Sequence, residues 1–209
     1  MEIEPQATDA RPDEERDRPA VAHPRQSASV IVLRDGDPGG GLRVLLVRRS
    51  PQQRFMGGYW VFPGGAVDPH EGVGEAAHRR AAVRELREEA SIDAIAPGEL
   101  VAFSRWITPE QLPIRFETHF FLVRAPAGAR ARVDGSECVD LRWDTPRALL
   151  AAQQAGEIEL APPTSRQLEQ LSGFASAAAL LDHARAHDVR PLRPVVRSGE
   201  IARIALPGD

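Results

Sequence analysis

The first two thirds of the chain contain short apolar segments that predict β-strands. Residues 29–33 and 43–48 are rich in β-branched and aliphatic residues, and the glycine- and proline-rich stretch 34–41 separates them. Two such segments around a turn are typical of a hairpin. Further strands are predicted over residues 59–62, 101–106, 117–124 and 139–143.

The pattern becomes helical between Gly74 and Ser91 and again after Thr145, where Pro146 suits the first helical position. Two more helices, with Thr164 and Ser176 as caps, are predicted over residues 164–171 and 176–187. One or two strands are expected in the ranges 194–197 and 201–206. This order predicts an α+β fold in which helices sandwich a mixed sheet.

The length of 209 residues indicates one domain with appendages. Residues 1–26 combine prolines with charges of both signs, so they are predicted to form a disordered tail. The catalytic domain is predicted over residues 27–161. The segment 162–209 is too short to sustain its own core, and its helices each have one apolar face, so it is predicted to pack on the same domain as a helical extension.

The composition excludes several classes of protein. The net charge is -4, which provides no basic field for nucleic acid. No apolar run is long enough for a membrane helix, and the first residues lack the apolar core of a signal peptide, so a cytoplasmic protein is expected. The single cysteine excludes zinc ribbons, and the absence of lysine excludes a Schiff base.

Three glutamates lie close together on the central helix. With about 100° per residue, and with Arg84 at zero, Glu88 falls near ~40°, Glu85 near ~100° and Glu89 near ~140°. The apolar residues Val83, Leu86 and Ala90 fall at roughly 200–260°, so they are expected to dock on the sheet and leave the acids facing outward. Neighbouring carboxylates repel each other, and a hard cation such as Mg²⁺ or Mn²⁺ removes this repulsion. The same pattern also occurs on solvated surface helices.

The segment before the helix favours the metal-binding interpretation. Gly64 and Gly65 end the strand 59–62, and two glycines allow the backbone to approach a ligand closely. The carbonyl of Gly64 could complete the coordination of a metal ion.

These residues resemble the box of the Nudix hydrolases. Gly65 and Glu71 match its first half, and its second half is matched by Arg84, Glu85, Leu86, Glu88, Glu89 and Ile92. Twelve residues instead of seven separate Glu71 from Arg84, and Ser91 replaces the late glycine. The insertion leaves open whether Glu71 or Glu75 meets Arg84. A narrower resemblance, carried by the segment 54–68 among others, is to the branch related to the peroxisomal coenzyme A diphosphatase of mammals.

The resemblance implies a set of catalytic and metal-binding residues. It assigns metal binding to Glu85, Glu88, Glu89 and Gly64, and it implies that Arg84 orients these carboxylates. A further glutamate before a Trp-containing strand is common in this family, which makes Glu137 a candidate metal ligand or general base. The base could equally be Glu85 or Glu89.

Cations beside aromatic residues provide the candidate contacts to substrate. Arginines close the strand before the box in this family, which points to Arg48. Two further pairs on neighbouring strands suit phosphate contact and base stacking, although ordinary core packing explains them as well. These candidates are Arg105, Trp106, Arg115 and Phe116.

The sequence therefore predicts a Nudix pyrophosphohydrolase that depends on Mg²⁺ or Mn²⁺ and cleaves the diphosphate of a nucleoside diphosphate derivative. Coenzyme A or acyl-coenzyme A is the first candidate substrate, and ADP-ribose or NADH is the alternative. A Nudix module that senses a nucleotide without cleaving it is the competing class. The family's sensing modules usually lose glutamates from the box, whereas all three stand here. The expected partner is a small molecule rather than nucleic acid or a membrane, and a homodimer is left open.

Overall fold

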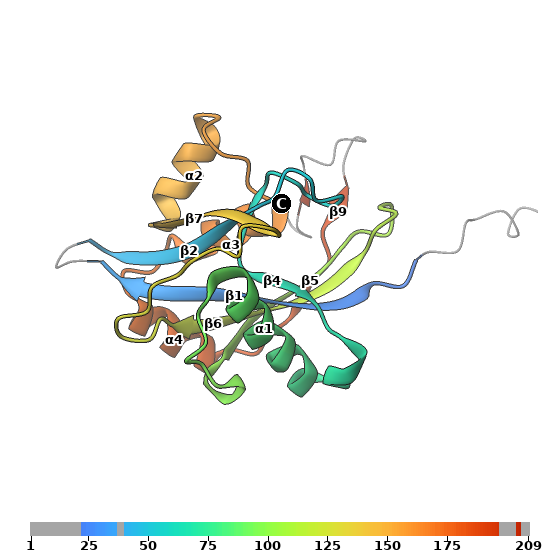
Figure 1. Ribbon diagram of the computed structural model, residues 1–209, viewed down its shortest axis with the longest axis horizontal. Coiled ribbons are helices and arrows are strands. Elements are labelled where there is room, and N and C mark those ends of the chain that lie inside the picture. Colours follow the sequence, from blue (N-terminus) through green and yellow to red (C-terminus); the bar gives the residue numbers. More distant parts are fainter. Residues whose placement is uncertain (1–21, 37–39, 197–203, 206–209) are drawn as a thin grey trace, which may run out of the picture.

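The fold is built on one mixed β-sheet (Figure 1). The computed structural model describes residues 22–36, 40–196 and 204–205. Eight strands form the main sheet, in the order β3-β2-β1-β6-β5-β8, with β4 paired to β1 and β7 paired to β2. The strands are β1 (Arg25–Asp35), β2 (Leu42–Arg49), β3 (Trp60–Val61), β4 (Gly64–Ala66), β5 (Val101–Ile107), β6 (Phe116–Arg124), β7 (Cys138–Asp144) and β8 (Pro191–Leu192). The predicted hairpin of β1 and β2 is confirmed, and the parallel pairing of β1 with β6 makes the sheet mixed.

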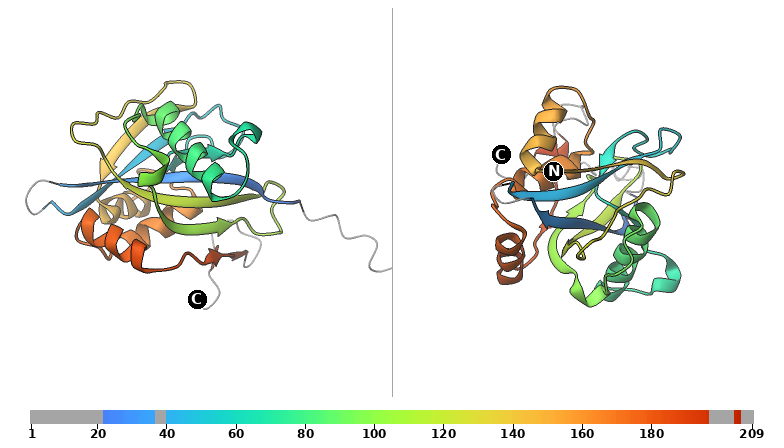
Figure 2. Two further views of the ribbon diagram at one scale, coloured as in Figure 1. Left: turned by 90° about the horizontal axis from the view of Figure 1, so that it is seen from below. Right: turned by 60° about the vertical axis from the view of Figure 1, so that its left-hand side comes forward.

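Helices cover both faces of the sheet (Figure 2). The helices are α1 (Glu75–Ala90), α2 (Pro146–Gln154), α3 (Pro162–Leu171) and α4 (Ala177–Ala186), with short 3-10 helices η1 (Pro69–Glu71) and η2 (Pro97–Glu99). Residues of β1 alternate between two cores, because successive side chains of a strand point to opposite faces. Val30 and Val32 pack with α1, whereas Ile31 and Leu33 pack in the core that includes α3 and α4. The predicted α+β sandwich is therefore confirmed.

Residues 60–66 form an interrupted strand between β2 and β1. β3 pairs with β2, and after Phe62 and Pro63 the chain continues as β4, which pairs with β1. The predicted end of the strand 59–62 is confirmed, because β3 stops before Pro63, but the sequence did not predict that the glycine pair begins a second strand. A Cβ on Gly64 would lie 2.7 Å from the Cα of Ser29, so glycine permits close strand pairing here rather than a turn.

The C-terminal helices begin at different kinds of residue. Ser176 caps α4 as predicted, and its hydroxyl accepts a hydrogen bond from the N–H of Ala179 at 3.2 Å. The predicted cap at Thr164 is wrong, because α3 begins at Pro162 and Thr164 is buried inside the helix. Proline suits this first position because the N–H that it lacks would have no helical partner.

The two ends of the chain are described only in part. Residues 1–21 of the predicted tail lie outside the described residues, and β1 begins at Arg25, within the range predicted for that tail. Two short strands in the predicted C-terminal ranges, β9 (Val195–Val196) and β10 (Ile204–Ala205), pair with each other. The residues 197–203 and 206–209 of those ranges are not among the described ones.

The segment after Ala161 has buried contacts with the sheet. Leu168, Leu171 and Leu180 are fully buried in the core shared with β1 and β6. The Asp35 carboxylate, at the end of β1, accepts a hydrogen bond from the N–H of Ala177 at 2.7 Å. These contacts support the proposal that the segment 162–209 is part of the same domain.

Limited proteolysis tests this proposal. We expect the peptide bonds around Pro162 to resist trypsin and subtilisin for as much time as those of the catalytic domain do. The reason is that α3 and α4 bury leucines that a free segment would expose. Mass spectrometry of the digestion products identifies the sites. Rapid cleavage near Pro162 that leaves a stable fragment ending there would contradict the proposal.

Ser91 ends α1 in a left-handed conformation, with φ 53° and ψ 33°. This conformation is strained for any residue with a Cβ and is unstrained for glycine. We predict that Ser91→Gly raises the free energy of unfolding by about 1 kcal/mol, which corresponds to a Tm increase of roughly 2–4 °C. Thermal unfolding measures the effect, and Ser91→Ala is the matched control that should bring no gain. Equal stability of all three proteins would contradict the prediction.

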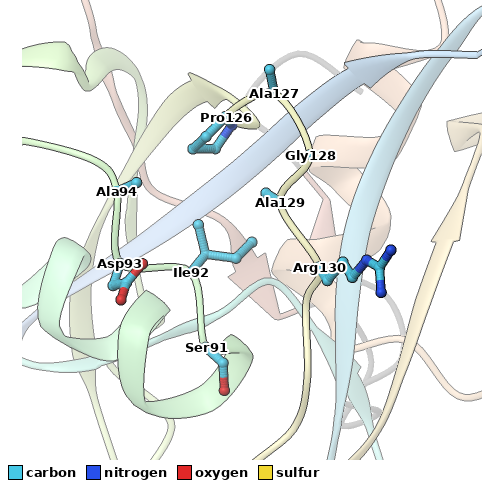
Figure 3. Close-up of a pocket in the computed structure, with 9 residues that line it drawn as sticks. All are labelled: Ser91, Ile92, Asp93, Ala94, Pro126, Ala127, Gly128, Ala129 and Arg130. Atoms are coloured by element: carbon cyan, nitrogen blue, oxygen red, sulfur yellow. The ribbon is translucent and has the colours of Figure 1, made fainter.

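The pocket behind the C-terminus of α1 is not the predicted site. It is a hollow of about 190 Å³ lined by residues 91–94 and 126–130, mostly with small side chains (Figure 3). None of the predicted site residues lines it.

None of the described helices has the length and apolar character that a membrane span requires.

Candidate active site

The glutamates of α1 are more buried than the sequence predicted. Only 2% of Glu89 and 9% of Glu85 are exposed, whereas Glu88 has a side chain that is 49% exposed. The expectation that all three acids face outward is therefore wrong. The helix docks through its alanines, including Ala81 and Ala82, and this packing turns Glu85 and Glu89 toward the sheet.

The glycine pair of β4 makes room for these two carboxylates. The N–H of Gly64 donates a hydrogen bond to Glu89 Oε2 at 2.9 Å. A Cβ on Gly65 would overlap the Glu85 carboxylate. Both glycines are therefore needed because the helix and β4 approach each other closely. The proposed role of the Gly64 carbonyl in metal binding stays a prediction.

Arg84 connects the box into one network. Its guanidinium donates to Glu71 Oε1 at 3.0 Å, to Glu85 Oε1 at 2.8 Å and to Glu88 Oε2 at 3.0 Å. It also donates to the carbonyl of Ala66 at 2.9 Å, which fixes the position of the helix relative to β4. The predicted orienting role of Arg84 thus has a geometric basis.

The insertion in the box does not change the partner of Arg84. Glu71 lies in η1 and is 5% exposed, while Glu75 pairs with Arg79 at 2.6 Å instead. Gly72 and Gly74 have positive φ angles of 86° and 76°, so the chain turns sharply between η1 and α1. This turn accommodates the extra residues and returns Glu71 to Arg84.

The carboxylates of the site differ in the direction of their pKa shifts, which is upward for Glu85 and Glu89 and downward for Glu71. Burial raises the pKa of Glu89 to about 7, and the charge of Glu85 adds to the effect, although the hydrogen bond from Gly64 opposes it. Burial also raises the pKa of Glu85, assisted by the charges of Glu88 and Glu137 and opposed by Arg84. Burial acts in the same direction on Glu71, but the hydrogen bond from Arg84 outweighs it and lowers the pKa. Glu85 and Glu89 therefore carry an electrostatic cost that a bound cation would relieve.

Arg49 is a residue of this site that the predicted set omits. It ends β2, and its Nη1 lies 3.8 Å from Glu89 Oε1. Its Nε is buried without a hydrogen-bond partner. The signal in the sequence was that Arg48 and Arg49 together close this strand, as in the family that the box resembles. Arg48 itself is exposed and donates to the carbonyl of Gly58 at 3.4 Å.

Glu137 lies close enough to Glu85 for its charge to raise the pKa of Glu85. Asp134 holds the backbone of Glu137 in place. The Asp134 carboxylate accepts hydrogen bonds from the N–H groups of Ser136, Glu137 and Cys138 at 2.7–2.9 Å. Although burial opposes it, these bonds and the Ser136 hydroxyl lower the pKa of Asp134 to about 2. Sequence reasoning found Glu137 but had no signal for Asp134.

The candidate substrate-binding residues are spread over different environments. Trp106 is 3% exposed and belongs to the hydrophobic core, so no face of its indole is open for stacking. Arg105 pairs with Glu117, and Arg115 is buried and donates to the carbonyls of Thr108 and Ala22. These observations favour the packing interpretation for Trp106 and Arg115, whereas Arg105, with a side chain that is 36% exposed, is held in an ion pair. Phe116 is partly exposed and contacts another aromatic ring.

No group of three or more acidic, histidine or cysteine side chains converges in metal-binding geometry within the described residues. Arg84 bridges Glu71, Glu85 and Glu88, and Arg49 approaches Glu89, so arginines occupy the places nearest these carboxylates. The oxygen donors themselves suit Mg²⁺ or Mn²⁺. Metal binding would therefore require these side chains to change their positions.

Known proteins are similar to this chain in sequence and in fold. The human acyl-coenzyme A diphosphatase NUDT19 is 24% identical in a 271-residue alignment that covers 78% of this chain and 72% of that protein. The putative nudix hydrolase 7 of Caenorhabditis elegans is 27% identical over 164 residues, which are 62% of this chain and 56% of the relative. This chain thus spans little more than half the length of that relative.

A solved structure supports the same relationship. The crystal structure of a NUDIX hydrolase from Alicyclobacillus acidocaldarius matches with a TM-score of 0.69 and 26% identity, covering 78% of this chain and 97% of that chain. The family model described as the NUDIX domain matches residues 23–166. Because this match extends over well more than half of the chain, the protein belongs to the Nudix family.

Proposed function

We propose that the protein is a pyrophosphohydrolase that uses Mg²⁺ or Mn²⁺ and cleaves the diphosphate of a nucleoside diphosphate derivative. One observation carries this proposal: Glu85 and Glu89 are buried against a glycine pair, and neither carboxylate has enough positive charge around it to restore its ordinary pKa. A protein that needed these residues for stability alone would do better with neutral side chains. All three glutamates of the box are present, which favours a catalytic role over a sensing one.

The residues have separate roles in this proposal. Glu85, Glu88 and Glu89, with the Gly64 carbonyl, would hold the metal, and Arg84 would set the directions of their carboxylates. A bound divalent cation would lower the pKa of the attacking water and neutralise the charge of the phosphates. Glu85, Glu89 and Glu137 remain the candidates for the general base.

Coenzyme A or acyl-coenzyme A is the proposed substrate, with ADP-ribose or NADH as the alternative. The similarity to the human acyl-coenzyme A diphosphatase supports the first choice, since it extends over 78% of this chain. A cytoplasmic location and a small-molecule partner complete the proposal.

A substrate screen tests the proposal. The purified protein is incubated with coenzyme A, an acyl-coenzyme A, ADP-ribose or NADH, with Mg²⁺, with Mn²⁺ or with EDTA, and the products are identified by mass spectrometry. We expect two products in equal amounts from at least one compound, each carrying one phosphate of the cleaved diphosphate, and none with EDTA. Tight binding of a nucleotide without any product would instead favour the sensing module.

A further inference from the structure

Two histidines lie side by side at the C-terminal end of α4. His183 is in the last turn of the helix, and His187 directly follows its last residue. Four residues separate them, so they are neighbours one helical turn apart. Their ring centroids lie 4.0 Å apart, with an angle of 28° between the ring planes, and both residues are exposed. We call His183 and His187 the histidine pair. Two imidazoles at this helical spacing can bind the same metal ion.

The backbone determines which nitrogen of His187 is free. Its Nδ1 lies 2.7 Å from the carbonyl oxygen of His183. A carbonyl can only accept a hydrogen bond, so Nδ1 carries the proton, and Nε2 keeps its lone pair in the neutral ring. A bond from the other ring nitrogen to a carbonyl is also what orients histidines in known metal sites. His187 therefore has Nε2 available as a metal ligand.

The ring of His183 is positioned by other rings rather than by polar groups. Besides its contact with His187, its centroid lies 5.1 Å from that of Phe174, with 54° between the planes. Phe174 in turn packs against the core that includes α3 and α4. Within the described part of the chain, neither nitrogen of the His183 ring takes part in a hydrogen bond or an ion pair. Both nitrogens can therefore turn toward a metal ion without breaking a polar contact.

The charges at this end of α4 favour a bound cation. The last carbonyls of a helix lack helical partners and give its C-terminus a partial negative charge. Arg185 lies between the two histidines in the sequence, but at about 100° per residue it falls roughly 200° from His183 around the helix. Its guanidinium pairs with Asp182 at 3.1 Å. A cation at the histidine pair would thus experience the helix terminus more than the charge of Arg185.

The histidine pair is separate from the glutamates of α1. The helix α4 packs in the core on one face of the sheet, and α1 packs in the core on the other face (Figure 2). The two places also differ in donor chemistry. Imidazole nitrogens suit Zn²⁺, Cu²⁺ and Ni²⁺, whereas carboxylate oxygens suit Mg²⁺ and Mn²⁺.

We propose that the histidine pair binds one divalent transition-metal cation of the Zn²⁺ class, with water in the remaining coordination positions. This site is independent of the proposed hydrolase function, because it uses neither the glutamates nor a substrate. A bound ion would connect the last turn of α4 to the residue that follows the helix. Since it binds the folded helix, the ion would stabilise the C-terminal extension.

Calorimetric titration with Zn²⁺ tests the proposal. Wild-type protein, His183→Gln, His187→Gln and the double variant are titrated at pH 7.5 with excess Mg²⁺, which competes for carboxylates. We expect each single substitution to weaken binding about tenfold or more, because even the loss of an outer partner of a metal site has this effect. The double variant should lose little beyond either single one, since both rings serve one ion. His23→Gln, at an exposed histidine outside the pair, is the matched control and should bind as the wild type does.

Thermal unfolding provides a second measurement. Saturating Zn²⁺ should raise the Tm of the wild type and of His23→Gln but leave that of both pair variants unchanged. Without metal, all these proteins should unfold at the same temperature, which shows that the substitutions do not disturb α4. Any hydrolysis found in the substrate screen should also be unaffected.

Three outcomes would overturn the proposal. If the pair variants bind Zn²⁺ as tightly as the wild type does, the ion lies elsewhere. If each single variant keeps half of the bound Zn²⁺ at unchanged affinity, the two imidazoles bind separately and form no common site. If the wild-type protein binds no Zn²⁺, the histidine pair is only a ring contact.

Discussion

Replacing Arg84 with methionine is expected to lower the free energy of unfolding by about 3–5 kcal/mol, the usual loss when one partner of a buried ion pair is removed. Methionine keeps the length and apolar stem of the side chain but removes every hydrogen bond to Glu71 and Glu85. Both carboxylates are buried, so they would remain charged without a partner or take up a proton. Urea denaturation at pH 7 measures the loss, and activity should fall with it.

Arg87→Met is the matched control for this substitution. Arg87 lies on the same helix but is exposed, so its replacement should change the free energy of unfolding by less than about 0.5 kcal/mol. The loss for Arg84→Met should also shrink at pH 4, because Glu71 and Glu85 are then neutral in the variant and need no cation. Equal losses in the two variants, or a loss that does not depend on pH, would show that Arg84 does not hold the buried acids.

Glu89→Gln is expected to reduce turnover at least ~100-fold, because it removes one charged ligand of the proposed metal site. The same substitution should stabilise the metal-free protein at pH 8, by up to roughly 3 kcal/mol if the pKa of about 7 is compared with an ordinary value of 4.5. Glutamine can still accept the hydrogen bond from Gly64. Activity and stability should thus change in opposite directions.

The pH dependence of this effect has a definite sign. Below pH 4.5, Glu89 is protonated in both the folded and the unfolded state, so it costs nothing. Between about pH 4.5 and 7 the unfolded chain releases the proton and the folded protein keeps it, so the contribution of Glu89 to stability falls as pH rises. Above pH 7 the full cost is present. Urea denaturation of both proteins in EDTA at pH 5 and pH 8 therefore gives a difference that grows with pH.

Two comparisons control the Glu89 experiment. Glu88→Gln removes a charge whose side chain is half exposed, so it should leave the stability of the metal-free protein nearly unchanged while it also lowers turnover. Saturating Mg²⁺ should stabilise the wild-type protein more than Glu89→Gln, since the ion binds the folded state. Full activity of both glutamine variants would refute the assignment of the metal ligands.

The sequence alone was sufficient for the local structure and for the family. Apolar, β-branched segments located β1, β2, β3, β5, β6 and β7, and a helical pattern located α1, because these elements bury apolar residues that are visible in the chain. The strands β4 and β8 were not predicted. The spacing of Gly65, Glu71 and the Arg84–Glu89 segment identified the Nudix box, although residues were inserted within it. The residue types also limited the chemistry to carboxylates, arginine and a hard cation.

Only the tertiary structure decided what surrounds each of these residues. Helical angles placed Glu85 and Glu89 on one stripe, but they could not show that a helix with small alanines would turn that stripe toward the glycine pair of β4. For Trp106 and Arg115 the sequence left ligand binding and packing open, and burial and backbone partners favour packing. Arg49 gained its place in the site from a residue far away in the sequence, Glu89. The physical reason is that periodicity determines which side chains share a face of one element. The burial of a side chain, its pKa and its hydrogen-bond partners depend on how separate elements pack together.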